Sequence, residues 1–204
     1  IMSLLLVTEA IDQGKIALTD VVTASAEASK MGGSQIWLKQ GEQMTVDDLL
    51  KATAIASAND ACFALGEYVA GSDTAFVKMM NDRAKELGMN DTVFENCSGL
   101  DDTVQNHITS AYDVAVMSRE LLKHERIRNY TTVWMDTLRG GETQLVNTNK
   151  LIRFYKGATG LKTGTTSKAG CCVSATAERD GLSLIAVIMG SESSNDRFSG
   201  ARAM

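Results

Sequence analysis

Apolar side chains recur at spacings of three and four positions through the first two thirds of the chain, which is the spacing of amphipathic helices. The chain starts inside such a pattern, and this first helix is expected to end near Gly14. A second helix is predicted over residues 41–57, with Thr45 as its N-cap and two aspartates in its first turn. A third is predicted over residues 59–71, where a glycine ends it.

Two further helices are predicted in the middle of the chain. Residues 110–127 begin with Ser110-x-x-Asp113, a variant of the capping box that marks helix starts. Residues 72–88 end at a glycine and place an apolar stripe on one helical face, made of Phe76, Val77, Met80, Ala84 and Leu87.

The last third of the chain changes to patterns typical of β-strands. Residues 171–178 and 182–190 flank an Asp-Gly pair, which predicts a hairpin. Residues 143–149 and 160–165 are further strand candidates. Because strands gather near the C-terminal end and helices in the middle, without alternating βα units, the pattern favours an α+β fold. We expect an antiparallel sheet flanked by helices, next to a mostly helical subdomain.

Composition narrows the possible functions. The net charge of −5 and a pI near 5.1, without a cluster of basic residues, argue against a nucleic-acid partner. The longest apolar runs, LLLV and SLIAVIM, are much shorter than the roughly 20 residues of a membrane helix. Neither a metal nor another cofactor is expected, since His107 and His124 have no ligand cluster around them. The cysteines lack metal-ligand spacing and are interpreted as small buried hydrophobes: Cys62, Cys97, Cys171 and Cys172.

The stretch LKTGTTSKAG, residues 161–170, combines a candidate strand with polar chemistry. Lys162 supplies a positive charge and Thr163 a hydroxyl donor, while Gly164 lets a ligand backbone approach the strand without a Cβ in the way. This order suits an extended peptide that adds to a strand edge and ends in a carboxylate. The triplet alone also fits a hairpin turn with a solvated lysine, so it does not decide between the two.

The tetrapeptide SAND, residues 57–60, lies between two predicted helices and also has two interpretations. Ser57-x-x-Asp60 is a capping box that would start the following helix. Alternatively, Ser57 and Asn59 project into a cleft, where the serine relays a proton and the asparagine holds an amide. Taken alone, the tetrapeptide favours the cap.

The two motifs together change this balance. Ser-x-Asn on a helix-rich segment, followed by Lys-Thr-Gly on a strand, resembles the serine-type penicillin-recognising enzymes. Residues 31–71, 76–102, 147–152 and 157–190 look like the D-alanyl-D-alanine carboxypeptidase family, the low-molecular-weight penicillin-binding proteins of serine peptidase family S11. The resemblance covers essentially the whole chain and implies a β-lactamase/transpeptidase-like fold.

The resemblance also implies an activity and roles for individual residues. The activity is hydrolysis that removes the terminal D-alanine of peptidoglycan stem pentapeptides through an acyl-enzyme. By motif match, Ser57 relays a proton to the leaving amine and Asn59 binds the amide backbone of the substrate. Lys162 adds positive potential for the terminal carboxylate, and Thr163 donates a hydroxyl to it. Thr165 gives a backbone N–H to the oxyanion hole.

The implied partners follow from this activity. They are a peptidoglycan stem peptide ending in D-Ala-D-Ala and the β-lactam antibiotics, without nucleic acid. The resemblance also implies that the protein lies outside the cytoplasm, either secreted or anchored to the outer face of the membrane. Its implied role is in peptidoglycan biosynthesis and cell shape. Any membrane attachment is expected only through a C-terminal region beyond this sequence.

One motif of the family does not occur in the sequence. The nucleophile and general base lie in a Ser-x-x-Lys motif, but no lysine here has a serine three positions before it. The nearest matches are Thr159-x-x-Lys162 and Thr165-x-x-Lys168, inside the strand motif. Because the family motif runs directly into a stretch like IMSLLL, we expect it immediately before Ile1.

Residues 1–204 are therefore interpreted as a partial transpeptidase-like catalytic domain. The missing parts are expected to be the N-terminal strands with the nucleophile motif and the C-terminal helix and β-domain. The segment alone is expected to be inactive. Ser3 is interpreted as a structural residue and not as a substitute nucleophile.

Two other functions remain possible at this point. A class A β-lactamase shares both triplets but needs a Glu-x-x-Leu-Asn loop, and Glu142 lies too close before Lys162 to supply it. Ala58 also stands where that class normally has Asp. A non-catalytic peptidoglycan-binding protein that has lost its nucleophile is the other alternative. The residues upstream of Ile1 distinguish it from an enzyme.

Overall fold

The structure is a computed structural model that describes residues 1–101 and 104–204, so Asp102, at the end of the family-like stretch 76–102, lies outside it. The helices are α1 (Met2–Asp12), α2 (Val46–Lys51), α3 (Asn59–Ala70), α4 (Asp73–Glu86), α5 (Ala111–Leu121), α6 (Arg128–Thr131), α7 (Leu151–Phe154) and α8 (Ser194–Ala203). The strands are β1 (Val21–Thr23), β2 (Gln43–Thr45), β3 (Met135–Leu138), β4 (Thr143–Val146), β5 (Ala158–Thr166), β6 (Gly170–Arg179) and β7 (Leu182–Ser191).

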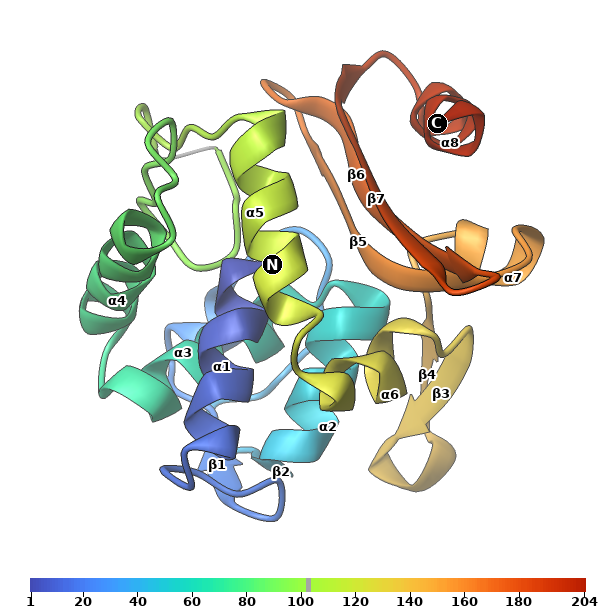
Figure 1. Cartoon of the computed structure of the whole chain (residues 1–204). Coiled ribbons are helices and arrows are strands. Elements are labelled where there is room, and N and C mark those ends of the chain that lie inside the picture. Colours follow the sequence, from blue (N-terminus) through green and yellow to red (C-terminus); the bar gives the residue numbers. More distant parts are fainter. Residues whose placement is uncertain (102–103) are drawn as a thin grey trace.

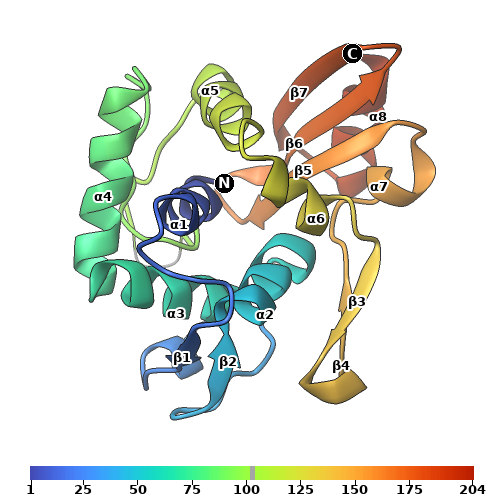
Figure 2. The same cartoon turned by 60° about the horizontal axis from the view of Figure 1, so that its bottom comes forward.

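Helix α1 lies at the centre of the helical part, with α3, α4 and α5 packed around it (Figures 1 and 2). Its first half is almost entirely apolar, and the side chains from Met2 to Val7 are buried, as expected for a segment enclosed by other helices. The buried hydroxyl of Ser3 donates to the backbone oxygen of Cys97 at 2.6 Å. Ser3 is therefore a core residue, one of the two structural positions, helix surface or core, that the sequence left open for it.

The predicted helix ends are confirmed where a capping residue or a terminal glycine marks them. Thr45 caps α2, its hydroxyl accepting from the backbone N–H of Asp48 at 3.1 Å. Gly71 ends α3 in the left-handed conformation, with φ of 81°. The hydroxyl of Ser110 accepts from the N–H of Asp113 and so caps α5. The α4 stripe faces inward, with Phe76, Met80 and Ala84 buried and Val77 and Leu87 partly buried.

The last third of the chain forms an antiparallel sheet in the order β5-β6-β7. In Figure 1 this sheet stands between α5 on one side and α8 on the other, and both helices contact it. Asp180 and Gly181 join β6 to β7 with φ of 51° and 78°, the left-handed pair that a tight type I′ hairpin requires. The predicted α+β fold and its hairpin are confirmed.

The two faces of the sheet differ in chemistry. Val173 and Ala175 of β6 pack with Phe198 of α8 in a small apolar core. Ser174, between them, points to the opposite face, where its hydroxyl lies 2.8 Å from that of Ser118 on α5. The face toward the helical part therefore carries small polar side chains at this position.

The interpretation of the cysteines is confirmed for Cys62 and Cys97, which are buried in the helical core. It is wrong for Cys171 and Cys172, which are only half-buried on β6. They lie beside the end of β5 and a strand irregularity, where the sheet is incompletely covered. Among the described residues, no helix combines the length and apolar content needed to cross a membrane.

Candidate active site

A cleft of about 500 Å³ opens between the start of α1, the segment before α3 and strand β5. The residues predicted from the two motifs all line it: Ser57, Asn59, Lys162, Thr163, Gly164 and Thr165. Tertiary folding therefore brings together two motifs that lie far apart in the sequence.

Ser57 is placed by an irregular helix end. Helix α2 widens into a π-helical turn over Ala52–Ala56, and Ser57 follows it in the left-handed conformation with φ of 61°. A left-handed non-glycine residue is strained, and such strain is common where a functional side chain must be presented. The sequence predicted one continuous helix here and did not indicate the π-helical turn.

The capping-box interpretation of residues 57–60 is wrong. The N-cap position of α3 belongs to Ala58, and the hydroxyl of Ser57 makes no capping hydrogen bond to this helix. The buried carboxylate of Asp60 instead accepts from the backbone N–H groups of Ile36 at 3.1 Å and Leu38 at 3.0 Å. Asp60 thus clamps a distant loop. Its carboxylate also accepts from the N–H of Ala61 at 2.9 Å, and a buried carboxylate needs several such donors.

Lys162 and Ser57 are in direct contact. The Lys162 Nζ atom donates to Ser57 Oγ at 2.6 Å, across 105 residues of sequence. It also donates to the backbone oxygen of Thr163 at 3.1 Å. Strand β5 is at the edge of its sheet, and Lys162 pairs there with Ser174 on the face toward the helices.

Burial, with a smaller contribution from the positive charge of Arg197, lowers the pKa of the Lys162 ammonium to about 8. Burial has this effect because it disfavours the charged form of the amine. An amine that titrates near neutral pH can both donate and accept a proton, so the contact with Ser57 Oγ is suited to proton relay.

Asn59 occupies the first position of α3 and is anchored to the loop across the cleft. Its Nδ2 atom donates to the backbone oxygen of Gly32 at 2.9 Å, and its backbone N–H donates to that of Ser34 at 2.7 Å. The amide is thereby held at the cleft wall, where it can pair with a ligand amide.

In the rest of the strand motif, Thr163 is buried, whereas Gly164 and Thr165 are exposed. Thr163 Oγ1 donates to Thr148 Oγ1 at 2.6 Å. A Cβ on Gly164 would meet no described protein atom within 4 Å, so protein packing does not explain the glycine. Thr165 is exposed beside it. The edge strand is therefore accessible to an extended ligand, and the alternative of a hairpin turn at this triplet is wrong.

Arg197 was missed by the sequence reasoning. It comes from α8, is buried behind β5, and its Nη1 atom donates to three oxygens of two strands: Gly164 O at 2.9 Å, Thr165 Oγ1 at 3.0 Å and Cys172 O at 3.1 Å. No local pattern could have found it, because its partners lie 25 to 33 residues earlier. This guanidinium holds the end of the motif strand in place.

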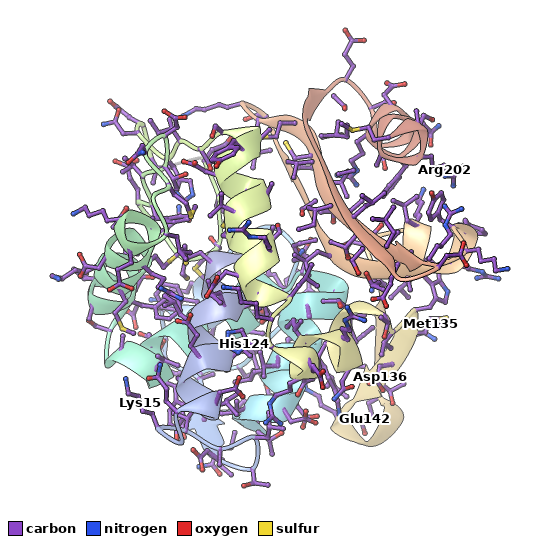
Figure 3. The ribbon with its side chains drawn as sticks, in the orientation of Figure 1. Lys15, His124, Met135, Asp136, Glu142 and Arg202 are labelled. Atoms are coloured by element: carbon purple, nitrogen blue, oxygen red, sulfur yellow. The ribbon has the colours of Figure 1, made fainter. Side chains whose placement is uncertain are left out.

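Glu142, the only candidate for the acidic residue of a class A β-lactamase, lies outside the cleft. It is exposed at the turn of the β3–β4 hairpin, and Figure 3 shows it at the far end of this hairpin from β5. The sequence already disfavoured this alternative, and the position of Glu142 gives it no support.

Comparison with known proteins agrees with this geometry. The model of the Peptidase_S11 family, D-alanyl-D-alanine carboxypeptidase, matches residues 1–193. The D-alanyl-D-alanine carboxypeptidase DacF of Bacillus subtilis is 48% identical over 200 residues, which are 97% of this chain and 51% of that protein. The chain therefore spans about half the length of this curated relative.

Solved structures show the same similarity. Penicillin binding protein 6B from Escherichia coli is 36% identical, with a TM-score of 0.89 over 98% of this chain and 66% of the other. Penicillin-Binding Protein D2 from Listeria monocytogenes, solved in an ampicillin-bound form, is 31% identical, with a TM-score of 0.88 over 98% and 81%. The chain belongs to the D-alanyl-D-alanine carboxypeptidase family, peptidase S11, the low-molecular-weight penicillin-binding proteins.

Proposed function

We propose that the protein containing this chain is a serine-type carboxypeptidase that removes the terminal D-alanine from peptidoglycan stem pentapeptides and is acylated by penicillins. The observation that carries the proposal is the contact of 2.6 Å between Lys162 Nζ and Ser57 Oγ. It joins the Ser-x-Asn and Lys-Thr-Gly motifs in one cleft. Because the substrate lies in the cell wall, the protein would act outside the cytoplasm.

The chemistry proceeds in two steps. A serine hydroxyl attacks the carbonyl carbon of the D-Ala–D-Ala bond, the C–N bond breaks and an ester forms. Ser57 gives its proton to the departing D-alanine amine and recovers one from Lys162, which donates to its Oγ atom. The attacking serine gives its proton to the general base, and the transfer of that proton to Lys162 returns both groups to their starting protonation states. Water then hydrolyses the ester and regenerates the serine.

The binding roles follow from position in the cleft. Lys162 and Thr163 would hold the terminal carboxylate, since charge-assisted hydrogen bonds to a carboxylate are the strong ones. The Thr163 hydroxyl would exchange Thr148 for the carboxylate as its acceptor. Asn59 would pair with the amide backbone of the substrate. Gly164 leaves room for the peptide along the strand, and the backbone N–H of Thr165 would be one donor of the oxyanion hole.

We further propose that the nucleophile and general base of the intact protein lie in a Ser-x-x-Lys motif before Ile1. Two observations support this. No lysine of the chain has a serine three residues before it. In addition, Ile1, Ser57 and Lys162 line the same small cavity, so a residue bonded to Ile1 would lie near both side chains.

Labelling with a fluorescent penicillin tests the position of the nucleophile. The intact protein is expected to form a covalent adduct, whereas the 204-residue chain alone is expected to form none. An adduct on the isolated chain would contradict the position proposed for the nucleophile. No adduct and no D-alanine release by the intact protein would instead favour a non-catalytic peptidoglycan-binding protein.

A substitution tests the role of Ser57. In the intact protein, Ser57→Ala is expected to reduce D-alanine release by about 10²–10⁴-fold, the usual contribution of a positioned proton donor. Stability should change little, since the Ser57 hydroxyl caps no helix. Ser72→Ala is the matched control, because it removes a real cap of α4 outside the cleft and should cost about 1 kcal/mol of stability without loss of turnover. Equal turnover of the two variants would exclude the relay.

A further inference from the structure

A second cavity of about 860 Å³ adjoins the cleft. This groove lies between the loop of residues 35–42 and the β3–β4 hairpin. At two places, a residue that lines the cleft is the sequence neighbour of a residue that lines the groove. Ser34 lines the cleft and Gln35 the groove, while Ala56 lines the groove and Ser57 the cleft. The cleft and the groove are therefore neighbours at two separate segments of the chain.

The groove presents an exposed tryptophan. Trp37 is 74% exposed, although its neighbours Ile36 and Leu38 are only 3% and 4% exposed. Both neighbours donate their backbone N–H to the buried carboxylate of Asp60. With both sides clamped inward, the indole is held out at the rim of the groove.

Backbone strain is concentrated at the cleft and the groove. Four described non-glycine residues have positive φ, and Asp180 is one of them because a hairpin turn requires it. Arg139, with φ of 52°, is another such residue, because it lies in the turn between β3 and β4. Of the remaining two, Ser57 lines the cleft, and Trp37, with φ of 59°, lines the groove. Strained residues of this kind cluster at ligand sites, where the surrounding structure holds them.

The groove is electrically balanced. Arg139 Nε donates to Glu42 Oε1 at 2.7 Å, and this partner holds the pKa of the Glu42 carboxyl below its usual value. Arg139 Nη1 also donates to the backbone oxygen of Ile36, so the pair is part of the same clamp. Lys39 and Glu142 add one charge of each sign at the edges. An uncharged ligand fits this balance better than a polyanion or a cation.

Three glutamine side chains complete the lining. Gln35, Gln40 and Gln144 make no side-chain hydrogen bond to another group among the described residues, and the last two are exposed. Each amide offers two donors and an acceptor. Free amides around an exposed indole are the combination that pyranose rings need, since their C–H faces stack on aromatic rings while their hydroxyl and acetamide groups form hydrogen bonds.

We propose that this groove binds the glycan of peptidoglycan, a chain of N-acetylated amino sugars, with Trp37 as its stacking platform. The choice of this glycan rests on the proposed function, because the stem peptide is attached to it. An extended peptide of five residues spans at most about 17 Å, so a stem in the cleft keeps its sugar near the adjoining groove. The groove would then orient the stem before its terminal residue is cleaved.

The test uses the tetramer of N-acetylglucosamine, which has no peptide and is not a substrate of the carboxypeptidase. In a Trp134→Phe background Trp37 is the single tryptophan, so its fluorescence reports the groove alone. We expect a saturable change in fluorescence on addition of the tetramer. The absence of saturable binding up to about 10 mM, a free energy weaker than about 3 kcal/mol, would overturn the proposal.

Calorimetric titration of matched variants checks the position of the binding site. Trp37→Ala is expected to weaken binding about tenfold or more, and Tyr112→Ala, which removes another aromatic residue with 74% exposure, is expected to leave it unchanged. Equal affinities of the two variants would refute the role of Trp37. Carboxypeptidase activity is measured separately on the intact protein. Tetramer binding without D-alanine release would contradict the proposed function alone, and release without binding would contradict the groove alone.

Discussion

The buried lysine at the centre of the cleft makes a specific contribution to the pH dependence of stability. Lys162 has a pKa of about 8 in the folded chain because burial disfavours its charge. In the unfolded chain a lysine titrates near about 10.4. Between these values the unfolded state holds a proton that the folded state has released, so stability rises with pH in this window.

The size of this effect follows from the two pKa values. At 1.36 kcal/mol per pH unit, a gap between about 8 and about 10.4 corresponds to about 3 kcal/mol. The penalty is fully present below about pH 8 and is relieved as pH rises toward about 10.4. Since the residue as a whole is only half-buried, solvent screening makes this an upper limit.

Comparison with Lys162→Met isolates the contribution of this one group. Methionine has a similar length and no charge, so the variant removes the titration while filling the same space. We expect the free energy of unfolding of the 204-residue chain, measured by denaturant titration at several pH values, to rise between pH 8 and 10 relative to that of the variant. Parallel pH profiles would refute the assignment of a lowered pKa to Lys162.

The same comparison separates stability from function. Below pH 8 the variant no longer carries the cost of a buried ammonium, so it is expected to be about as stable as the parent chain or more stable. In the intact protein it is nevertheless expected to lose D-alanine release, because Ser57 loses its proton donor. A site that costs stability in order to function is common in enzymes.

Three further substitutions test the supports of the site. Gly164→Ala is expected to change the free energy of unfolding by less than about 1 kcal/mol, since its Cβ meets no described protein atom within 4 Å, yet to slow penicillin acylation of the intact protein about tenfold. Unchanged acylation would mean that no ligand lies along this strand. Arg197→Met is expected to cost about 2 kcal/mol and lower the melting temperature by about 4–8 °C, because three oxygens on β5 and β6 lose their donor. A variant with an unchanged melting temperature would show that the guanidinium does not hold the strand. Asp60→Ala is expected to cost about 3–5 kcal/mol in denaturant titrations, because it leaves buried N–H groups of Ile36 and Leu38 without an acceptor. A cost below about 1 kcal/mol would show that Asp60 does not clamp this loop.

Features with a local cause were determined by the sequence itself. The cap at Thr45, the end of α3 at Gly71 and the hairpin turn at Asp180 each depend on a few neighbouring residues, and each is found where the pattern predicts it. The α+β class followed from the change of period along the chain. The family followed from two short motifs and the stretches around them.

Features that depend on distant partners were decided only by the tertiary structure. Ser57 and Asp60 have the spacing of a capping box, but the carboxylate has better donors 22 to 24 residues away, and the serine turns toward Lys162. Arg197 has the local sequence of a surface arginine, and only the packing of α8 against the sheet buries it.

Trp37 is the converse case, an apolar residue that tertiary contacts place at the surface. Its sequence neighbours are apolar, so hydrophobicity alone would place it in the core. The clamp by Asp60 and Arg139 holds it at the surface instead. A sequence determines helix ends and turns because their hydrogen bonds are local, whereas the placement of a buried charge or an exposed indole depends on contacts that form only when the whole chain has folded.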